Sequence, residues 1–575
     1  MTNILGIKYG GHDTAAALVV DGELVSACAQ ERYTHDKHSR RFPKEAAIDC
    51  LRIGGININE VDELAFVNDY RTYIREIYLR PSLQSDDRMD FLFKDIDRVT
   101  RAYKIEDLIR ENLNYKGKIN FYRHHLCHIA SAYYPSGFNN ALCLSLDGVG
   151  EFETGMIAAG KSGELEILNK NNIYPNSFGL LYSAITDYLG WKHHCDEGII
   201  MGLAPYGNPF AKISGKKRDY ISVFEEILIE KGEFEYEINL DLIDYYSQRD
   251  KWVTENFLQI FGPKRKSNGP ILDHHKNIAA ALQTRLECVV LKQLKSARKR
   301  FDLNKLCLAG GVALNCSMNG KIAQSNLFDE IFVQPASGDD GCTFGACLLA
   351  YKSIKGSLLP KKMHNFYKGS CFSEKEINDA IQKSNLKFIS PKNIYKTIAQ
   401  YLADGKIIGW FQDSAEFGPR ALGNRSILCR PYPASMKDYL NSRVKFREDF
   451  RPFAPSVLEN YQSQYFDLNQ DSPHMLIACQ VKSDKRNVIP AVVHVDGTCR
   501  VHTVKKELNE KLYNLLEQFN VLTGVPIILN TSFNIKGQPI VNTPEEAINT
   551  FKTTKIDVLV LGNSFVIKDK NNQDI

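Results

Sequence analysis

Short apolar runs separated by turn signals open the chain. One run precedes Gly10 and Gly11, a second ends at Asp21 and Gly22, and a third follows in LVSACAQ. Runs of this kind, bounded by Gly and Asp, are typical of β-strands joined by tight turns. The same pattern of strand, Asp-Gly turn and strand returns at 141–160. The first part of the chain is therefore predicted to contain two related halves.

Helical segments lie between further apolar strands. Helices are predicted over 277–300, 372–384 and 393–404, and another after the glycine-rich stretch PASGDDG. Strands are predicted in KLCLAGGVALN, IIGWFQ, PIILN and VLVLGNSFVIKD. Alternation of strands and helices predicts an α/β fold.

Changes in composition mark the domain boundaries. The 575 residues have room for about two to four folding units. Lys, Gly and Pro at 356–370 are typical of a linker, so one domain is predicted over 1–355 and a second α/β domain over 371–575. The charged, irregular segment 207–275 is interpreted as an insertion or lid.

Charge and cysteine content exclude several classes of protein. The chain has 72 basic and 68 acidic residues and a formal charge of +4, which favours neither nucleic acid nor membrane as a partner. Polar residues near the start and the lack of a long apolar run predict a cytoplasmic protein. The 14 cysteines are scattered without a CxxC pair and are expected to be reduced. A homodimer is compatible with this composition.

Two histidines four residues apart suggest a metal site. His124 and His128 would share one face of a helix, although paired histidines also pack in ordinary amphipathic helices. Asp147 follows a predicted strand, and Asp339 lies in the GDDG turn. Because a first-row metal site also needs carboxylates, these four residues together are predicted to be metal ligands.

Glycine-rich turns after strands suggest a nucleotide. Such turns let the backbone approach a phosphate, but each glycine pair alone is also compatible with an ordinary turn. Several turns of this kind, together with Asp339, favour ATP. The predicted nucleotide-binding residues of this part of the chain are Asp147, Gly148 and Gly150 in LDGVG, and Gly310, Gly311 and Asn315 in GGVALN.

The second domain is rich in arginine. Forked guanidinium groups suit phosphate and planar carboxylate-like groups, and Pro, Gly and Phe between them argue against a solvated basic helix face. A loop after the strand PIILN adds neutral hydrogen-bonding groups. An anion site is therefore predicted. The basic residues are Arg420, Arg425, Arg430, Lys445, Arg447, Arg451 and Arg500, and the neutral ones are Asn530, Ser532 and Asn534.

These motifs, in this order, resemble the O-carbamoyltransferases, including those for nodulation factors and antibiotics. The set comprises GIKYGGHD, ERYTHDKHSRRFP, HHLCHIASA, LDGVGE, TDYLG, EGIIMGLAPYG, GGVALN and PASGDDG and covers nearly the whole chain. The resemblance implies an N-terminal domain similar to tRNA threonylcarbamoyl transferases, in the duplicated ATP-binding class of actin, hexokinase and heat-shock chaperones. It implies a YrdC-like C-terminal domain. Ile199 departs from the pattern, which commonly has lysine there.

The resemblance also implies roles for the predicted site residues. Arg420, Lys445 and Arg500 would hold carbamoyl phosphate, and the other C-terminal site residues would complete the place where ATP converts it into carbamoyl adenylate. The N-terminal ligands would hold iron, and Mg²⁺ could accompany ATP. The carbamoyl group would then pass to a hydroxyl of a natural product or sugar-like small molecule.

A general base is needed to activate the acceptor hydroxyl. His12, in the GGHD turn, has a side chain with a suitable pKa, although a histidine in a turn is often structural. Lys37 is a further candidate for the acceptor site. The alternatives are a threonylcarbamoyl transferase acting on tRNA, transfer to a protein cysteine, a sugar kinase and a non-catalytic ATP-binding regulator. The near-neutral charge, the lack of a CxxC pair and the arginine-rich second domain argue against them.

Overall fold

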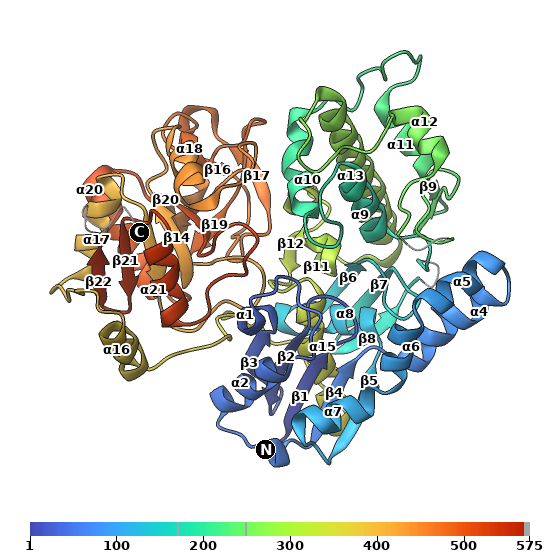
Figure 1. The fold of residues 1–575 in the computed structure, drawn as a ribbon, viewed down its shortest axis with the longest axis horizontal. Coiled ribbons are helices and arrows are strands. Elements are labelled where there is room, and N and C mark those ends of the chain that lie inside the picture. Colours follow the sequence, from blue (N-terminus) through green and yellow to red (C-terminus); the bar gives the residue numbers. More distant parts are fainter. Residues whose placement is uncertain (170–171, 248–249, 569–575) are drawn as a thin grey trace. The chain divides into compact units, whose positions relative to one another are not determined.

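The computed structural model describes residues 1–169, 172–247 and 250–568. The chain forms two compact units (Figure 1). Unit 1 comprises Met1–Gln30 and His38–Met363, and unit 2 comprises Glu31–Lys37 and His364–Ile575. The predicted linker 356–370 contains the residue where unit 2 resumes. The last seven residues of the predicted second domain lie outside the described residues.

Unit 1 contains two five-stranded sheets with the same connectivity. The first has the order β3 (Glu23–Ala29), β2 (Ala15–Val20), β1 (Asn3–Lys8), β4 (Glu63–Val67), β5 (Lys118–Tyr122). The second has the order β8 (Glu164–Ile167), β7 (Gly155–Lys161), β6 (Asn140–Leu146), β11 (Lys305–Ala309), β12 (Glu330–Val333). The central strand of each sheet pairs antiparallel on one side and parallel on the other: β1 with β2 and β4, and β6 with β7 and β11. The predicted duplicated fold is therefore confirmed.

Two buried helices fill the space between these sheets. Helix α8 (His124–Ser136) packs on β6, β7 and β11, and α15 (Cys342–Lys355) packs on β1, β2 and β4. The two helices also pack against each other. The contact is close because Gly345 of α15 lies against the carbonyl oxygen of Cys127 in α8. Small residues at such crossings let the backbones approach and fix the positions of both helices.

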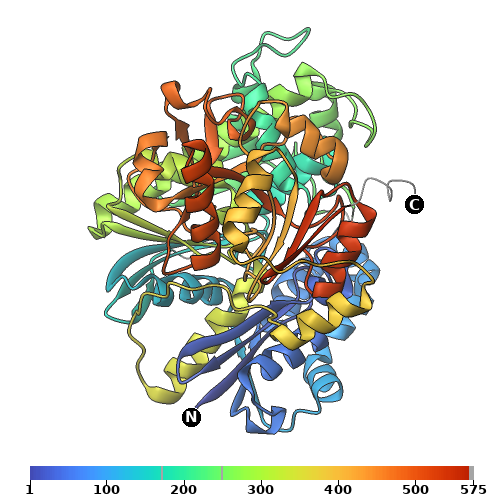
Figure 2. The ribbon, with the colours of Figure 1, turned by 90° about the vertical axis from the view of Figure 1, so that its left-hand side faces the viewer.

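Further helices surround the two sheets of unit 1. Figure 2 shows the first sheet, in blue, from a second direction. The predicted helix 277–300 is confirmed as part of α13. The described part of the segment 207–275 contains α11, α12, the first residues of α13 and the hairpin of β9 (Leu228–Lys231) and β10 (Glu235–Ile238), so it is more regular than expected. The other helices of unit 1 are α2 (Lys44–Gly54), α3 (Tyr70–Tyr73), α4 (Arg80–Ser82), α5 (Asp86–Lys94), α6 (Ile96–Tyr103), α7 (Ile105–Leu113), α9 (Phe178–Tyr188), α10 (Glu197–Leu203), α11 (Tyr220–Ile227), α12 (Glu255–Phe261), α13 (Asp273–Phe301) and α14 (Cys316–Gln324).

Unit 2 has a seven-stranded mixed sheet. Its order is β19 (His502–Val504), β15 (Ala454–Leu458), β20 (Ile527–Ser532), β14 (Arg425–Cys429), β13 (Ile408–Phe411), β21 (Val558–Leu561), β22 (Ser564–Ile567). A smaller sheet contains β16 (Phe466–Asp467), β17 (Ala478–Val481) and β18 (Thr498–Arg500). The helices are α1 (Glu31–Thr34), α16 (Glu374–Lys383), α17 (Ile394–Ala403), α18 (Met436–Leu440), α19 (Gln462–Tyr465), α20 (Glu510–Thr523) and α21 (Pro544–Thr553). The predicted α/β class is confirmed in both units.

The structure also bears on membrane-spanning helices and on the cysteines. None of the described helices combines the length and apolar character needed to cross a membrane. All 14 cysteines are free thiols, and most of them are buried.

We expect Gly345→Ala to destabilise the protein. A Cβ atom at this position would lie 1.8 Å from the carbonyl oxygen of Cys127, so α8 and α15 would have to separate. Overpacking of this kind costs about 1–3 kcal/mol. The free energy of unfolding, obtained from urea titration, measures the effect. Gly198→Ala is the matched control, because a Cβ atom there meets nothing within 4 Å; an equal loss in both variants would contradict the proposed close contact.

Candidate functional site

Four side chains converge where α8, the end of β6 and the turn before α15 meet. His124 and His128 lie one helical turn apart on α8, as predicted from their spacing. Asp147 directly follows β6, and Asp339 begins the short turn that leads into α15. The ligand atoms of these four residues lie within 4.8 Å of one another. They form a candidate metal centre.

The distances fit metal coordination. The Nε2 atoms of His124 and His128 are 3.0 Å apart and lie 3.1 and 2.9 Å from Oδ2 of Asp147. Oδ1 of Asp339 lies 3.4 and 3.8 Å from the same two nitrogens. Two nitrogens bound at about 2.1 Å on perpendicular axes of one ion are separated by about 3.0 Å. Two neutral imidazoles and two carboxylates are a suitable donor set for a divalent first-row metal.

Burial and mutual contact set the charges of this centre. Burial alone would raise the pKa of Asp147, but hydrogen bonds with His124 and His128 hold it well below its ordinary value. Burial disfavours a charged His124, yet Asp339 and Asp147 raise its pKa. Burial lowers the pKa of His128. The carboxylates thus favour a charged His124, whereas burial favours the neutral form of His128, which is the form that binds a metal ion.

Three neighbouring residues complete the surroundings of the centre. Burial opposes the charge of Lys8, but its contact with Asp339, 3.1 Å from Nζ to Oδ2, keeps the pKa raised. His125 is held by the hydroxyl of Ser145 at 2.9 Å and the carbonyl of Glu153 at 3.0 Å. Burial keeps the thiol of Cys342 protonated by raising its pKa. Lys8 was not predicted as a site residue, although a lysine at the end of a buried apolar strand was the signal.

The predicted glycine turns allow close approach of two strand ends. Gly310 has a φ of +88°, and a Cβ atom there would lie 2.2 Å from the carbonyl oxygen of Leu146. A Cβ on Gly311 would lie 2.9 Å from Oδ1 of Asp147. The space beside Asp147 therefore depends on glycine.

The remaining residues of the predicted nucleotide site lie close by. A Cβ on Gly150 would lie 3.0 Å from the Cβ of His124, and the backbone N–H of Gly148 donates to Oδ1 of Asp147 at 2.7 Å. Asn315 caps α14 and exchanges hydrogen bonds with Gln283. The amide of Asn315 is thus already engaged within the protein.

His12 belongs to a second polar cluster of unit 1. Its Nδ1 lies 2.8 Å from Asp13, whose other oxygen lies 2.7 Å from Nδ1 of His38. Burial lowers the pKa of His12, but Asp13 outweighs this effect and raises it. A histidine oriented by a carboxylate, with its Nε2 on the other side of the ring, has the geometry of a general base.

The partners of His12 were not predicted as site residues. Asp13 and His38 have backbone φ values of 55° and 57°, which residues other than glycine seldom adopt. Such strained residues tend to cluster at functional sites. The motif letters gave no signal of these backbone angles.

In unit 2, Lys445 is buried against the end of β20. Its ammonium donates to Oγ of Ser532 at 3.2 Å, to the carbonyl of Asn534 at 3.1 Å and to Oδ1 of Asn534 at 2.8 Å. Burial, followed by the charges of Arg447 and Arg451, lowers its pKa well below the ordinary value. The structure therefore brings the predicted residue Lys445 together with the predicted residues Ser532 and Asn534.

Several other cations surround Lys445. Burial and the charges of Arg451 and Arg500 lower the pKa of Arg447 to about 9. The guanidinium of Arg447 lies 4.4 Å from the centre of the Phe453 ring. Lys37 also belongs to unit 2, where its charge acts on Lys445. Cations that disfavour one another in this way are stabilised by a bound anion.

Two further predicted residues are linked to this cluster through β20. Asn530 donates to the hydroxyl of Ser456 at 3.0 Å and to the carbonyl of Ala421 at 3.2 Å. The second bond ties the loop that carries Arg420 to the strand that ends at Ser532. Arg420 is half-buried in this loop.

Two arginines of the predicted anion site have structural contacts instead. Arg425 is fully buried, donates to the carbonyls of Ser370, Asp413 and Asn424, and lies 3.7 Å from the centre of the Phe411 ring. Arg430 donates to the carbonyl of Ala403 at 2.8 Å. Their placement differs from the expectation because the sequence alone did not show which arginines are enclosed by backbone oxygens.

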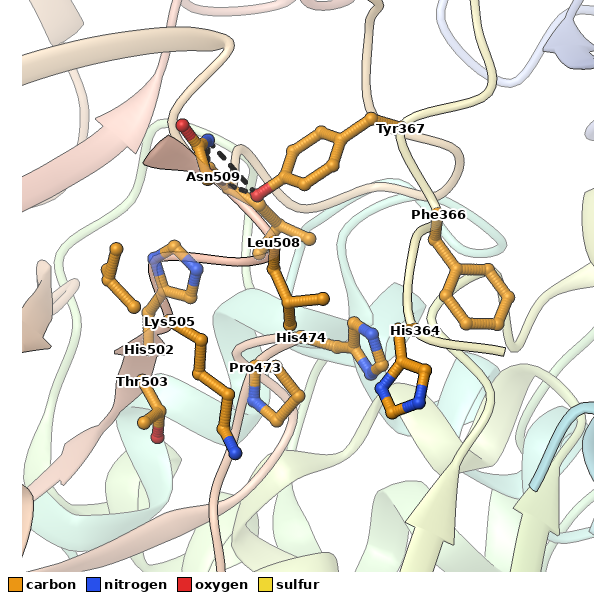
Figure 3. Close-up of a pocket in the computed structure, with 12 residues that line it drawn as sticks. His364, Phe366, Tyr367, Pro473, His474, His502, Thr503, Lys505, Leu508 and Asn509 are labelled. Atoms are coloured by element: carbon orange, nitrogen blue, oxygen red, sulfur yellow. Dashed lines mark hydrogen bonds between the residues drawn. The ribbon is translucent and has the colours of Figure 1, made fainter. Parts of the chain in front are cut away.

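A small cavity in unit 2 lies beside a chain of buried polar groups. Figure 3 shows the hydroxyl of Tyr367 directed at the amide of Asn509, 3.2 Å away, with His474 and His502 also lining the cavity. Nδ1 of His502 lies 2.8 Å from the hydroxyl of Ser456, which accepts a hydrogen bond from Asn530. Burial lowers the pKa of His502 to about 3. A neutral His502 can thus accept from Ser456 and support β20.

Family comparisons cover most of the chain. The carbamoyltransferase N-terminus model matches residues 3–348, and the carbamoyltransferase C-terminus model matches residues 399–568. Nodulation protein NolNO of Sinorhizobium fredii is 37% identical over 97% of this chain and 79% of its own length. Nodulation protein NolO of Bradyrhizobium diazoefficiens is 38% identical over 77% of this chain and 78% of its own length. An uncharacterised protein of Synechocystis is 35% identical over 100% of this chain and 98% of its own length.

Solved structures give more distant likenesses. The (R)-2-hydroxyglutaryl-CoA dehydratase component A of Acidaminococcus fermentans is 14% identical and covers 62% of this chain and 100% of its own, with a TM-score of 0.34. HypF of T. kodakarensis is 15% identical and covers 62% of this chain and 48% of its own, with a TM-score of 0.34.

We expect His128→Ala to reduce metal binding at least about tenfold, because it removes one of two convergent imidazoles. The measurement is the amount of Fe(II) retained per chain after anaerobic loading and desalting, determined by elemental analysis. His125→Gln is the matched control on the same helix, since His125 binds Ser145 and Glu153 instead. Equal iron loss in both variants would refute the assignment of ligands.

Acid is expected to weaken unit 2 through His502. In the unfolded chain a histidine has a pKa of about 6.5, so between pH 6.5 and about 3 the unfolded state binds more protons. The stabilisation is therefore fully present above pH 6.5 and is lost as the pH falls. His502→Gln should reduce the difference between the free energies of unfolding at pH 7 and pH 5 by about 2 kcal/mol.

Urea titrations of the full chain at the two pH values provide the measurement. His364→Gln is the control, because His364 lines the same cavity but is exposed. A wild-type pH dependence in His502→Gln would show that His502 is not held neutral by the fold.

Proposed function

Since the chain belongs to the O-carbamoyltransferase family, we propose that it transfers a carbamoyl group in two steps, the first of which consumes ATP. The enzyme class is carbamoyltransferase. Carbamoyl phosphate would be the donor, and a hydroxylated small molecule, such as a natural product or a sugar, would be the acceptor. The observation that carries this proposal is the group of mutually repelling cations around Lys445, which would be stabilised by an anionic donor.

The first step takes place in unit 2. Arg447, Arg451 and Arg500 neutralise carbamoyl phosphate, and Lys445 is positioned by Ser532 and Asn534 to contact the same anion. Water releases inorganic phosphate and leaves carbamate. A carbamate oxygen then attacks the α-phosphorus of ATP, pyrophosphate leaves, and carbamoyl adenylate forms. Arg420 and Asn530 complete the surroundings of this site in the proposal. Lys37, expected at the acceptor site, is assigned here instead because its charge acts on Lys445.

The second step takes place in unit 1. His12, oriented by Asp13, accepts the proton of the acceptor hydroxyl through its Nε2. The hydroxyl oxygen attacks the carbamoyl carbon, the bond from that carbon to the adenylate oxygen breaks, and AMP leaves. His38 holds the other oxygen of Asp13 and so fixes the direction of the His12 ring. The glycine turns at Gly148 and Gly310 would leave space for the adenylate phosphate.

The donor set of unit 1 fits a divalent ion, and we propose iron, with Mg²⁺ as a companion of ATP. The ligands would be His124, His128, Asp147 and Asp339, whose donor atoms already converge. When bound, the ion supplies positive charge that stabilises the anionic adenylate. Lys8 holds Asp339 in place by an ion pair at 3.1 Å.

We expect Arg500→Ala and His12→Asn to separate the two steps. Arg500→Ala should abolish carbamoyl phosphate-dependent release of pyrophosphate from ATP, because it removes a cation from the donor site. His12→Asn should retain pyrophosphate release but stop formation of the carbamate ester. Pyrophosphate is measured enzymatically, and carbamate esters are detected by mass spectrometry with a library of hydroxylated acceptors.

Arg486→Ala is the matched arginine control for the first step. Its guanidinium contacts Val481 and Gln480, so pyrophosphate release should remain within about twofold of the wild type. Release of ADP instead of pyrophosphate would contradict adenylate formation. Equal loss of pyrophosphate release in Arg500→Ala and His12→Asn would contradict the division of labour between the units.

A further inference from the structure

A row of aromatic rings leads away from His12. The ring of His12 stacks on that of His194, with centroids 5.4 Å apart and planes inclined by 27°. His194 contacts His193 at 4.9 Å and Trp252 at 5.4 Å. His193 and Trp252 are 4.5 Å apart. The candidate base therefore lies at one end of a half-buried aromatic surface within unit 1.

Trp252 comes from the segment 207–275, whose role the sequence did not reveal. The bridge between Ile243 and Val253 and the hydrogen bond from Thr254 N to Leu242 O fix the backbone on either side of Trp252. Tyr245 lies behind it, with ring centroids 6.3 Å apart. This segment thus supplies a firmly held aromatic side chain to the row that begins at His12.

An open pocket of about 500 Å³ is lined by Lys192, the residue directly before His193. Pockets of roughly 300–1,000 Å³ are typical of small-molecule sites. Three exposed lysines and a buried arginine give it a positive charge that one aspartate offsets only in part. The residues that line it are Asp187, Gly190, Trp191, Lys192, Lys264, Arg265, Lys266 and Ser267.

The wall of this pocket is rigidly built. The guanidinium of Arg265 lies 4.1 Å from the centre of the Trp191 ring and donates to the carbonyl of Gly269 at 2.6 Å. Lys264 pairs with Asp187 at 2.7 Å. The ammonium groups of Lys192 and Lys266 have no ion-pair partner within the described part of the chain, so both are available to a ligand.

The pocket and the aromatic row are neighbours in unit 1. Lys192 lines the pocket and precedes His193 directly in the sequence. Asp187 and Lys264, which also line the pocket, are near enough for their charges to act on the imidazole of His193. A molecule bound in the pocket could therefore extend along the rings to His12.

We propose that the acceptor is a ring-containing molecule that carries an anionic group, a phosphate or a carboxylate, away from the hydroxyl that is carbamoylated. The ring lies against Trp252 and His193, the anionic group contacts Lys192 and Lys266, and the hydroxyl reaches His12. This inference rests on the proposed function, because it assigns the acceptor to the base of the second step. It also gives the segment 207–275 a role in acceptor selection.

Tryptophan fluorescence tests this acceptor site directly. The pocket and the aromatic row together are called the groove. The chain has three tryptophans; Trp191 and Trp252 belong to the groove, and Trp410 is buried in unit 2. The full-length protein is titrated with phenyl phosphate, benzoate and benzyl alcohol, which share an aromatic ring and differ in charge. We expect at least one of the two anions to bind saturably and at least about tenfold more tightly than benzyl alcohol. The tighter anion identifies the group as phosphate or carboxylate.

Substitutions locate the binding. Trp252→Phe should remove most of the fluorescence change. The double substitution Lys192→Ala and Lys266→Ala should weaken binding of the preferred anion at least about tenfold. Lys295→Ala, at an exposed lysine that does not line the pocket, should leave it unchanged. Equal binding of all three probes, or anion binding that does not depend on Lys192 and Lys266, would overturn the proposal.

The same wild-type preparation is assayed for carbamoyl phosphate-dependent pyrophosphate release. Pyrophosphate release without preference for an anionic probe contradicts the groove and leaves the proposed two-step reaction standing. Preference for an anionic probe without pyrophosphate release contradicts the proposed reaction and leaves the groove as an anion site. The two failures are therefore distinguishable.

Discussion

The carboxylates of Asp147 and Asp339 are held out of water against two imidazoles and the ammonium of Lys8. Buried charges are tolerated only when their partners are fixed in place. Unit 1 meets this condition through the close packing of α8 on α15 and through the glycine at the end of β11, which lets two strand ends approach. The duplicated sheets are thus the support for one small group of opposite charges.

Unit 2 solves the opposite electrostatic problem. The ammonium of Lys445 donates to neutral oxygen acceptors at the end of β20, while burial and the charges of Arg451 and Arg500 disfavour the charged form of Arg447. A bound anion would offset the repulsion between these cations and so stabilise the site further. In our proposal the donor is activated among these cations, and the base in unit 1 then takes the proton of the acceptor hydroxyl as that hydroxyl attacks the activated carbamoyl group.

The sequence predicted those features that depend on local spacing. Each of these features depends on residues that are close together in the sequence. They are the two histidines on one helix face, the repeated strand and turn pattern and the long helix of 277–300. The association of Lys8 with Asp339, or of His12 with His194, depends on contacts across more than a hundred residues. Arg425 shows the converse: its motif suggested an anion site, but burial among backbone carbonyls gives it a structural role.

The most direct test of the two-step account is an acceptor-free reaction of the full-length protein with carbamoyl phosphate and ATP, analysed by mass spectrometry after rapid quenching. The account predicts a species with the mass of carbamoyl adenylate, formed together with an equal amount of pyrophosphate. Formation of ADP, with neither carbamoyl adenylate nor pyrophosphate, would contradict it.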